Sequence, residues 1–210
     1  RRGAGRDLEG EQLELELAMQ SEPGQLRLQL RQGSASLPAD SLRVDALTGS
    51  FVWRGDTLLV ERVQLRTPAS LVEGRGVLDP ARRAGSFDGN VSPLDLPELT
   101  RGARLAARRG RLQGPLQVRW LGQDLTLSGT LTGDLDTYRL SQVEFELLSQ
   151  PGSVKLRGAS GIVNDSALEL WLEYAKPSLR GRLVLRDVDA RRFVPPEQAS
   201  KLPPNRLNGE

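Results

Sequence analysis

The sequence contains no cysteine and no histidine among its 210 residues, and only 4% of them are aromatic. Without cysteine the chain forms no disulfide and offers no thiolate to a metal. It also lacks the side chains that most often act as acid–base catalysts and as thiol nucleophiles near neutral pH. We therefore expect a protein that is not an enzyme, with no catalytic residue, no cofactor and no metal.

Long apolar runs and clustered charge are missing as well. No stretch of about 18 or more apolar residues occurs, so the sequence predicts no membrane-spanning helix. The 29 basic and 27 acidic residues nearly balance and are interleaved. The densest basic run, 101–111, holds no aromatic ring on which a base could stack. We therefore expect no nucleic-acid partner.

The sequence is rich in apolar and polar residues that alternate with period two. Leu26, Leu28 and Leu30, for example, alternate with Arg27 and Gln29. This pattern is typical of a β-strand with one apolar face and one wet face. Turn signals separate the alternating runs at short, regular intervals, which favours antiparallel strands. They lie at Glu22-Pro23-Gly24, Arg54-Gly55-Asp56, Gly85, Gly122-Gln123-Asp124, Pro151-Gly152 and Asn164-Asp165.

One short helix is predicted near 97–108. Pro97 suits a first helical turn, and Glu98 suits the positive end of the helix dipole. Arg108 and Arg109 suit the other end, whereas Gly102 weakens the helix.

Internal repetition is the more informative signal. A Leu-x-Gly start at Leu112 recurs at Leu8 and at Leu207. Asp95 and Asp189 each open a helix-like or proline-rich stretch that ends in an arginine just before the next start. We predict one repeat unit over 8–111, a second over 112–206 and the beginning of a third at 207–210. The chain begins and ends in mid-pattern, and we expect it to be a fragment.

The apolar residues of one parity in the second unit are candidates for a functional surface. They could form the closed core of a sandwich or barrel, or they could line an open groove that holds lipid tails. Repetition and the scarcity of rings favour the groove. The candidate lining residues are Leu116, Val118, Leu125, Leu127, Leu131, Leu135, Val143, Phe145, Leu147, Val154, Leu156, Leu168, Leu170 and Leu172.

Acidic pairs are the remaining candidates for chemistry. Glu144 and Glu146 alternate with apolar residues, as do the glutamates Glu169 and Glu173, so all four are expected on a solvated face. Asp134 and Asp136 lie near a strand end, where aspartate more often makes a turn than binds calcium.

Three motifs of the sequence belong together: Leu94-Asp95-Leu96-Pro97-Glu98-Leu99, Val188-Asp189-Ala190-Arg191-Arg192-Phe193 and Gly110-Arg111-Leu112-Gln113-Gly114. With the Leu-x-Gly starts they resemble the AsmA-like superfamily of bacterial envelope proteins, of AsmA/TamB type. The resemblance covers most of the chain and is weakest from Gln20 to Asp40. It implies an all-β fold of repeated antiparallel strands curled into an open groove, the β-taco form.

The resemblance also implies a location and a role. The protein would lie in the periplasm, tethered to the inner membrane by an anchor outside this sequence. It would carry phospholipid or other acyl-chain cargo, or support outer-membrane assembly, with an outer-membrane protein as a further partner at one end. Arg182 and Arg186 depart from the pattern, because they lie beside Leu183 and Leu185 and suggest a more polar last strand.

A second hypothesis is a structural or adhesive β-solenoid of a secreted or surface protein, with a filled core and no lipid cargo. Such solenoids have short parallel rungs of about 20–30 residues. The repeat here is about a hundred residues long and has hairpin-like turns, which favours the groove.

Overall fold

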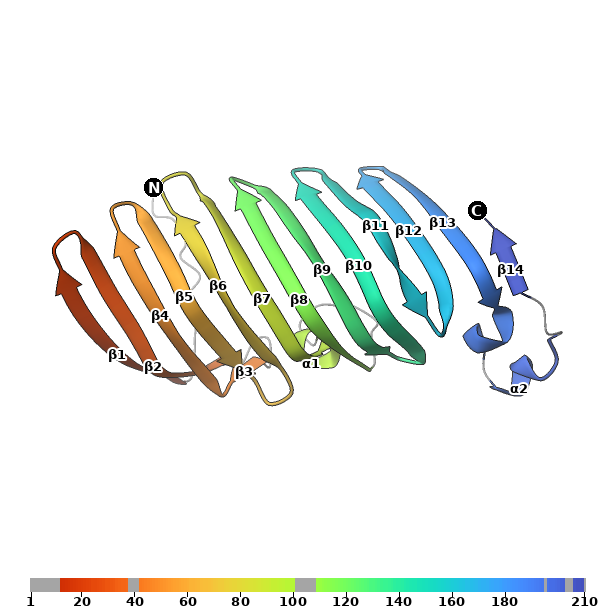
Figure 1. Cartoon of the computed structure of the whole chain (residues 1–210), viewed down its shortest axis with the longest axis horizontal. Coiled ribbons are helices and arrows are strands. Elements are labelled where there is room, and N and C mark those ends of the chain that lie inside the picture. Colours follow the sequence, from red (N-terminus) through yellow and green to blue (C-terminus); the bar gives the residue numbers. More distant parts are fainter. Residues whose placement is uncertain (1–11, 38–41, 101–108, 195, 203–205, 210) are drawn as a thin grey trace.

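A computed structural model of the chain describes residues 12–37, 42–100, 109–194, 196–202 and 206–209. These residues form one open antiparallel sheet of 14 strands (Figure 1). The strands follow one another in chain order from β1 to β14, except that the short β3 pairs with β2 beside this path. The predicted all-β array of antiparallel strands, curled into an open groove rather than closed on itself, is confirmed.

The strands of the central part are long, mostly of 9 to 13 residues, and they curve along their length in Figure 1. Their bounds are β1 Gln12–Glu22, β2 Gln25–Leu37, β3 Leu42–Val44, β4 Ala46–Arg54, β5 Thr57–Arg66, β6 Leu71–Asp79, β7 Ala84–Asp95, β8 Gly110–Leu121, β9 Asp124–Leu135, β10 Tyr138–Gln150, β11 Ser153–Val163, β12 Ser166–Ala175, β13 Ser178–Asp189 and β14 Arg206–Gly209.

The ends of the strands form two long edges of the sheet, and these two edges differ in their connections. At one edge, the upper one in Figure 1, short turns join the strands, and we call this edge the hairpin rim. At the opposite edge lie the helices α1 (Leu96–Thr100), η1 (Ala190–Phe193) and α2 (Pro196–Ala199), and we call this edge the connection rim. The turns of the hairpin rim are 23–24, 55–56, 80–83, 122–123, 151–152 and 176–177.

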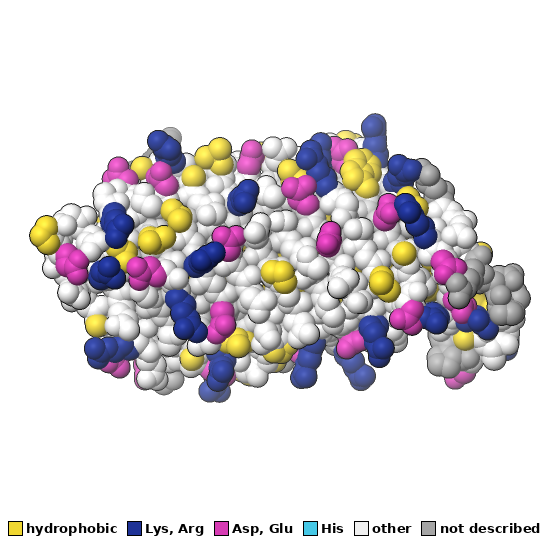
Figure 2. Space-filling model, in the orientation of Figure 1, with side chains coloured by type: hydrophobic (Ala, Val, Ile, Leu, Met, Phe, Trp, Pro, Cys, Tyr) yellow, Lys and Arg dark blue, Asp and Glu magenta, His cyan; other side chains and the backbone are white. Residues whose placement is uncertain are grey.

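The period-two alternation of the sequence separates the two faces of the sheet. Val118 lies opposite Leu127, and Leu127 lies opposite Leu147, so these three side chains share one face, the apolar face. Glu173 lies opposite Lys155 on the other face, the polar face. Figure 2 shows charged side chains of both signs interspersed over the polar face, with hydrophobic side chains scattered among them.

The sheet is a single layer within the described residues. The chain exposes 15079 Å² of surface, whereas a compact protein of 23.0 kDa exposes about 9,600 Å². Few apolar side chains of the described residues are buried, namely Leu30, Val52, Val60, Val91, Leu112 and Val188. The structure therefore excludes the closed sandwich or barrel core for the described strands.

Two local predictions need correction or restriction. Gly85 is not a turn residue, because it lies inside β7, and the turn before it spans 80–83. The predicted helix near 97–108 is represented by α1 at Leu96–Thr100; positions 101–108 lie outside the described residues, as does the Leu8 start.

The two predicted unit boundaries occupy equivalent places in the sheet. Asp95 at the end of β7 lies opposite Arg111 of β8, and Asp189 at the end of β13 lies opposite Arg206 of β14. Both aspartates also cap the turn that follows, because Asp95 Oδ1 accepts the Glu98 N–H and Asp189 Oδ1 accepts the N–H of Arg191. The unit ranges themselves stay a prediction.

Candidate functional site: an open apolar face

The predicted lining residues are brought together on one face. The cross-strand registers of β8 to β12 place all fourteen of them on the apolar face. Most of these side chains are half-buried although no second layer covers them, so they shield one another within the face. Arg182 and Arg186 lie on the other side: Arg182 is opposite Trp171, and Arg186 forms an ion pair with Glu169. The last long strand therefore does not interrupt the apolar face.

The apolar face continues well beyond the residues that the sequence singled out. One row of directly opposed residues crosses the sheet from β1 to β13 without a polar side chain. At about 4.8 Å per strand this row is about 53 Å long. Its members are Met19, Leu28, Phe51, Val60, Gly76, Phe87, Val118, Leu127, Leu147, Leu156, Leu172 and Gly181.

Aromatic rings pack over glycines on the apolar face. The ring of Phe87 lies over Gly74 and Gly89, and the indole of Trp120 lies over Gly85, so closely that a Cβ on these glycines would collide with the ring. Rings from the same or a neighbouring strand fill the space that these glycines would otherwise leave, which keeps the apolar surface continuous.

At the connection rim, α1 is fixed by a buried carboxylate. Glu98 is 6% exposed, and its Oε2 accepts hydrogen bonds from Thr67 Oγ1 (2.5 Å) and Ser70 Oγ (2.8 Å) in the turn between β5 and β6. Ser70 Oγ in turn accepts the Asp95 N–H. Each of these polar groups takes part in a hydrogen bond, so the network holds the helix against the sheet. No sequence pattern predicts this network, because Glu98 lies 31 and 28 positions from its two partners.

The second connection docks at the equivalent turn, between β11 and β12. Arg192 of η1 forms an ion pair with Asp165, and the Asn164 side chain donates to the Arg192 carbonyl. Asp189 forms a two-point contact with the Arg191 guanidinium. This contact, with the Arg191 N–H, lowers the pKa of Asp189 from 3.8 to about 2.

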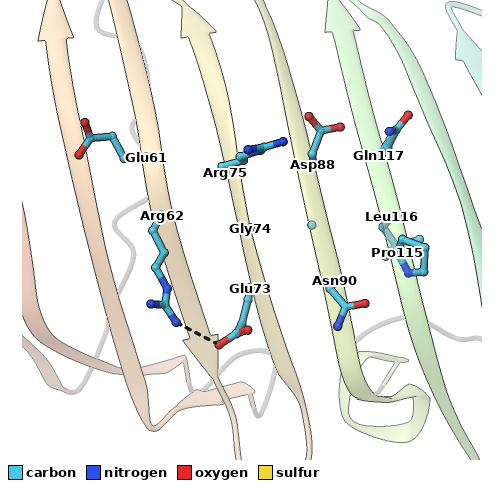
Figure 3. Close-up of a pocket in the computed structure, with 11 residues that line it drawn as sticks. Glu61, Arg62, Glu73, Gly74, Arg75, Asp88, Asn90, Pro115, Leu116 and Gln117 are labelled. Carbon is cyan, nitrogen blue, oxygen red and sulfur yellow. Dashed lines mark ion pairs between the residues drawn. The ribbon is translucent and has the colours of Figure 1, made fainter.

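The acidic pairs lie on the polar face, as predicted. The hydrogen bond from Lys155 lowers the pKa of Glu173, and the Lys155 Nζ lies 2.7 Å from the Glu173 carboxylate. Figure 3 shows a shallow hollow on this face, where the guanidinium of Arg62 points to the carboxylate of Glu73 at 3.8 Å. Charges that pair across neighbouring strands are typical of a solvated face.

The described part of the chain contains no group of three or more acidic side chains placed to hold a metal ion. Asp136 lies in the turn between β9 and β10, where its carboxylate accepts the Arg109 N–H.

Comparison with known proteins gives no relative. No protein-family model, no curated protein and no solved structure matches this chain. Among the described residues, no helix combines the length and the apolar character that crossing a bilayer requires.

Proposed function

We propose that this chain is a segment of a periplasmic protein of AsmA/TamB type, whose apolar face holds the acyl chains of phospholipid. The single observation that supports this function most strongly is the unbroken apolar row across the sheet, uncovered in the described structure. Monomeric soluble proteins rarely leave an apolar surface of this extent open unless it binds something.

The composition of the face suits a cargo that slides. Each methylene of an acyl chain that leaves water for the apolar face gains about 0.8 kcal/mol. Leucine and valine offer that gain evenly from strand to strand, and the rings of Phe87 and Trp120 fill the space above glycines. A bound chain can then move along the row without a deep energy minimum. The same surface would serve phospholipid transport between membranes or outer-membrane assembly.

The second hypothesis is the structural or adhesive array with a filled core. It requires the apolar side chains to be covered by other protein. In the described residues the sheet is single-layered and Leu125, Val154 and Leu183 remain more than a third exposed, which favours the lipid-binding hypothesis.

A matched pair of substitutions tests the proposal. Leu127 and Thr126 are neighbours on β9 that point to the apolar and polar faces respectively. The purified chain is titrated with a phospholipid that carries a fluorescent acyl chain. We expect saturable binding, and we expect Leu127→Asp to weaken it about tenfold, because loss of contact with about two methylenes costs about 1.6 kcal/mol.

Thr126→Asp is the control and should bind as the original chain does, and circular dichroism checks that both variants keep their strands. Equal binding by the two variants would contradict the assignment of the apolar face. Absence of binding by the original chain would contradict the lipid function and favour the filled-core array.

A further inference from the structure

Three aromatic side chains are spaced evenly along the hairpin rim. Trp53, Trp120 and Tyr174 each occupy the last apolar-face position before a hairpin-rim turn, on β4, β8 and β12. In the order of the sheet these strands are four places apart, which corresponds to about 19 Å between successive rings. Their cross-strand partners are Leu58, Leu125 and Leu179, so each ring lies beside an aliphatic side chain.

The two ends of the strands differ in exposure. At the hairpin rim Trp53 is 40%, Tyr174 45% and Leu179 68% exposed. At the connection rim, Val91 and Leu112 are nearly fully buried. At these positions the apolar face is more open at the hairpin rim than at the connection rim.

The second helical connection contacts the apolar face at the same rim. Phe193 of η1 packs against Tyr138 at the start of β10, with ring centroids 6.1 Å apart. Val188, at the end of β13, is 5% exposed. Both connections thus lie against the same rim of the sheet.

The chemistry of the rim rings suits a boundary between polar and apolar groups. Tryptophan and tyrosine have an apolar body and a polar edge, and they concentrate where lipid headgroups meet hydrocarbon. The indole of Trp53 is oriented accordingly, since its Nε1–H donates to the Gly55 carbonyl in the rim turn at 2.6 Å. Its polar edge thus faces the turn.

We infer that phospholipid on the apolar face lies with its headgroup at the hairpin rim, beside Trp53, Trp120 and Tyr174, and with its tails directed toward the connection rim. This inference rests on the proposed lipid function and adds the orientation of the cargo. The rim rings mark the level of the glycerol backbone, and the side chains farther along each strand contact the tails.

Intrinsic fluorescence tests the orientation, because the chain has three tryptophans. Trp171→Phe leaves Trp53 and Trp120, both on the rim of the apolar face. The double variant Trp53→Phe/Trp120→Phe leaves Trp171, which lies on the polar face opposite Arg182, as the control. Each protein is mixed with monomeric short-chain phospholipid that carries a nitroxide quencher either on the headgroup or at the end of an acyl chain.

We expect the headgroup nitroxide to quench the rim tryptophans at least about twofold more than the tail-end nitroxide, as their boundary position requires. The Trp171 protein should show little quenching by either lipid. Equal or stronger quenching by the tail-end label, with binding intact, would overturn the orientation and leave the lipid function standing. No quenching by either label, together with no lipid binding in a separate titration, would overturn both.

Discussion

Replacement of Glu98 by alanine should loosen the connection rim and destabilise the protein. The carboxylate is buried and accepts hydrogen bonds from Thr67 and Ser70. Alanine leaves both buried hydroxyls without their acceptor. Hydrogen bonds to a charged group contribute about 1.5–3 kcal/mol each, so we expect the loss of two to cost about 3–6 kcal/mol. For a chain of this length that corresponds to a fall of roughly 6–24 °C in Tm.

The matched control is Glu197, which follows a proline at the start of α2 as Glu98 does in α1, but is exposed. Glu197→Ala should change Tm by at most about 1–2 °C, as expected for an exposed side chain. Thermal unfolding followed by circular dichroism measures both variants. Hydrogen exchange at 67–70 should rise in Glu98→Ala alone. Equal Tm changes in the two variants would refute the role of the buried carboxylate.

Two further predictions concern the glycines beneath aromatic rings and the stability of the protein in acid. Gly74→Ala should cost about 1–3 kcal/mol in urea unfolding, because its Cβ would lie 2.6 Å from the Asp88 carbonyl oxygen and the backbone must shift. Gly49→Ala meets mainly a side-chain ring and should cost less; equal losses would contradict this. Asp189 has a folded-state pKa lowered to about 2, so its contribution is complete above pH 3.8 and is lost as the pH falls toward 2. Hydrogen-exchange protection at 190–193, corrected for the intrinsic pH dependence of amide exchange, should therefore fall over that range in the original chain and vary little in Asp189→Asn; the same profile of protection against pH in both would contradict this.

Much of the fold follows from the sequence because period-two alternation assigns each side chain to a face. It placed Leu127 and Phe145 on the apolar face and Glu169 and Glu173 on the polar face, and the registers agree. The predicted turn at Gly85 was wrong, since glycine occurs both in turns and beneath aromatic rings. A nearby Pro80 and the left-handed Arg83 (φ 51°) make the turn instead.

The hydrogen-bond network at the connection rim could not be predicted from the sequence, for a different reason. Glu98, Thr67 and Ser70 form one network across 28 to 31 positions of sequence, and no periodic pattern links them. The alignment of Trp53, Trp120 and Tyr174 at the hairpin rim could not be predicted either, because it depends on the strand order and the register. Whether the apolar face binds lipid or protein is also not encoded in alternation, which is the same for both.

Site-specific photo-crosslinking tests the central claim most directly. A photoreactive residue is placed at Leu127 or Phe145 on the apolar face, or at Thr126 on the polar face as a control, and the purified protein is irradiated with phospholipid. The lipid-binding account predicts phospholipid adducts at Leu127 and Phe145 and few at Thr126. Equal capture at all three positions, or no lipid adduct at the apolar positions, would contradict it.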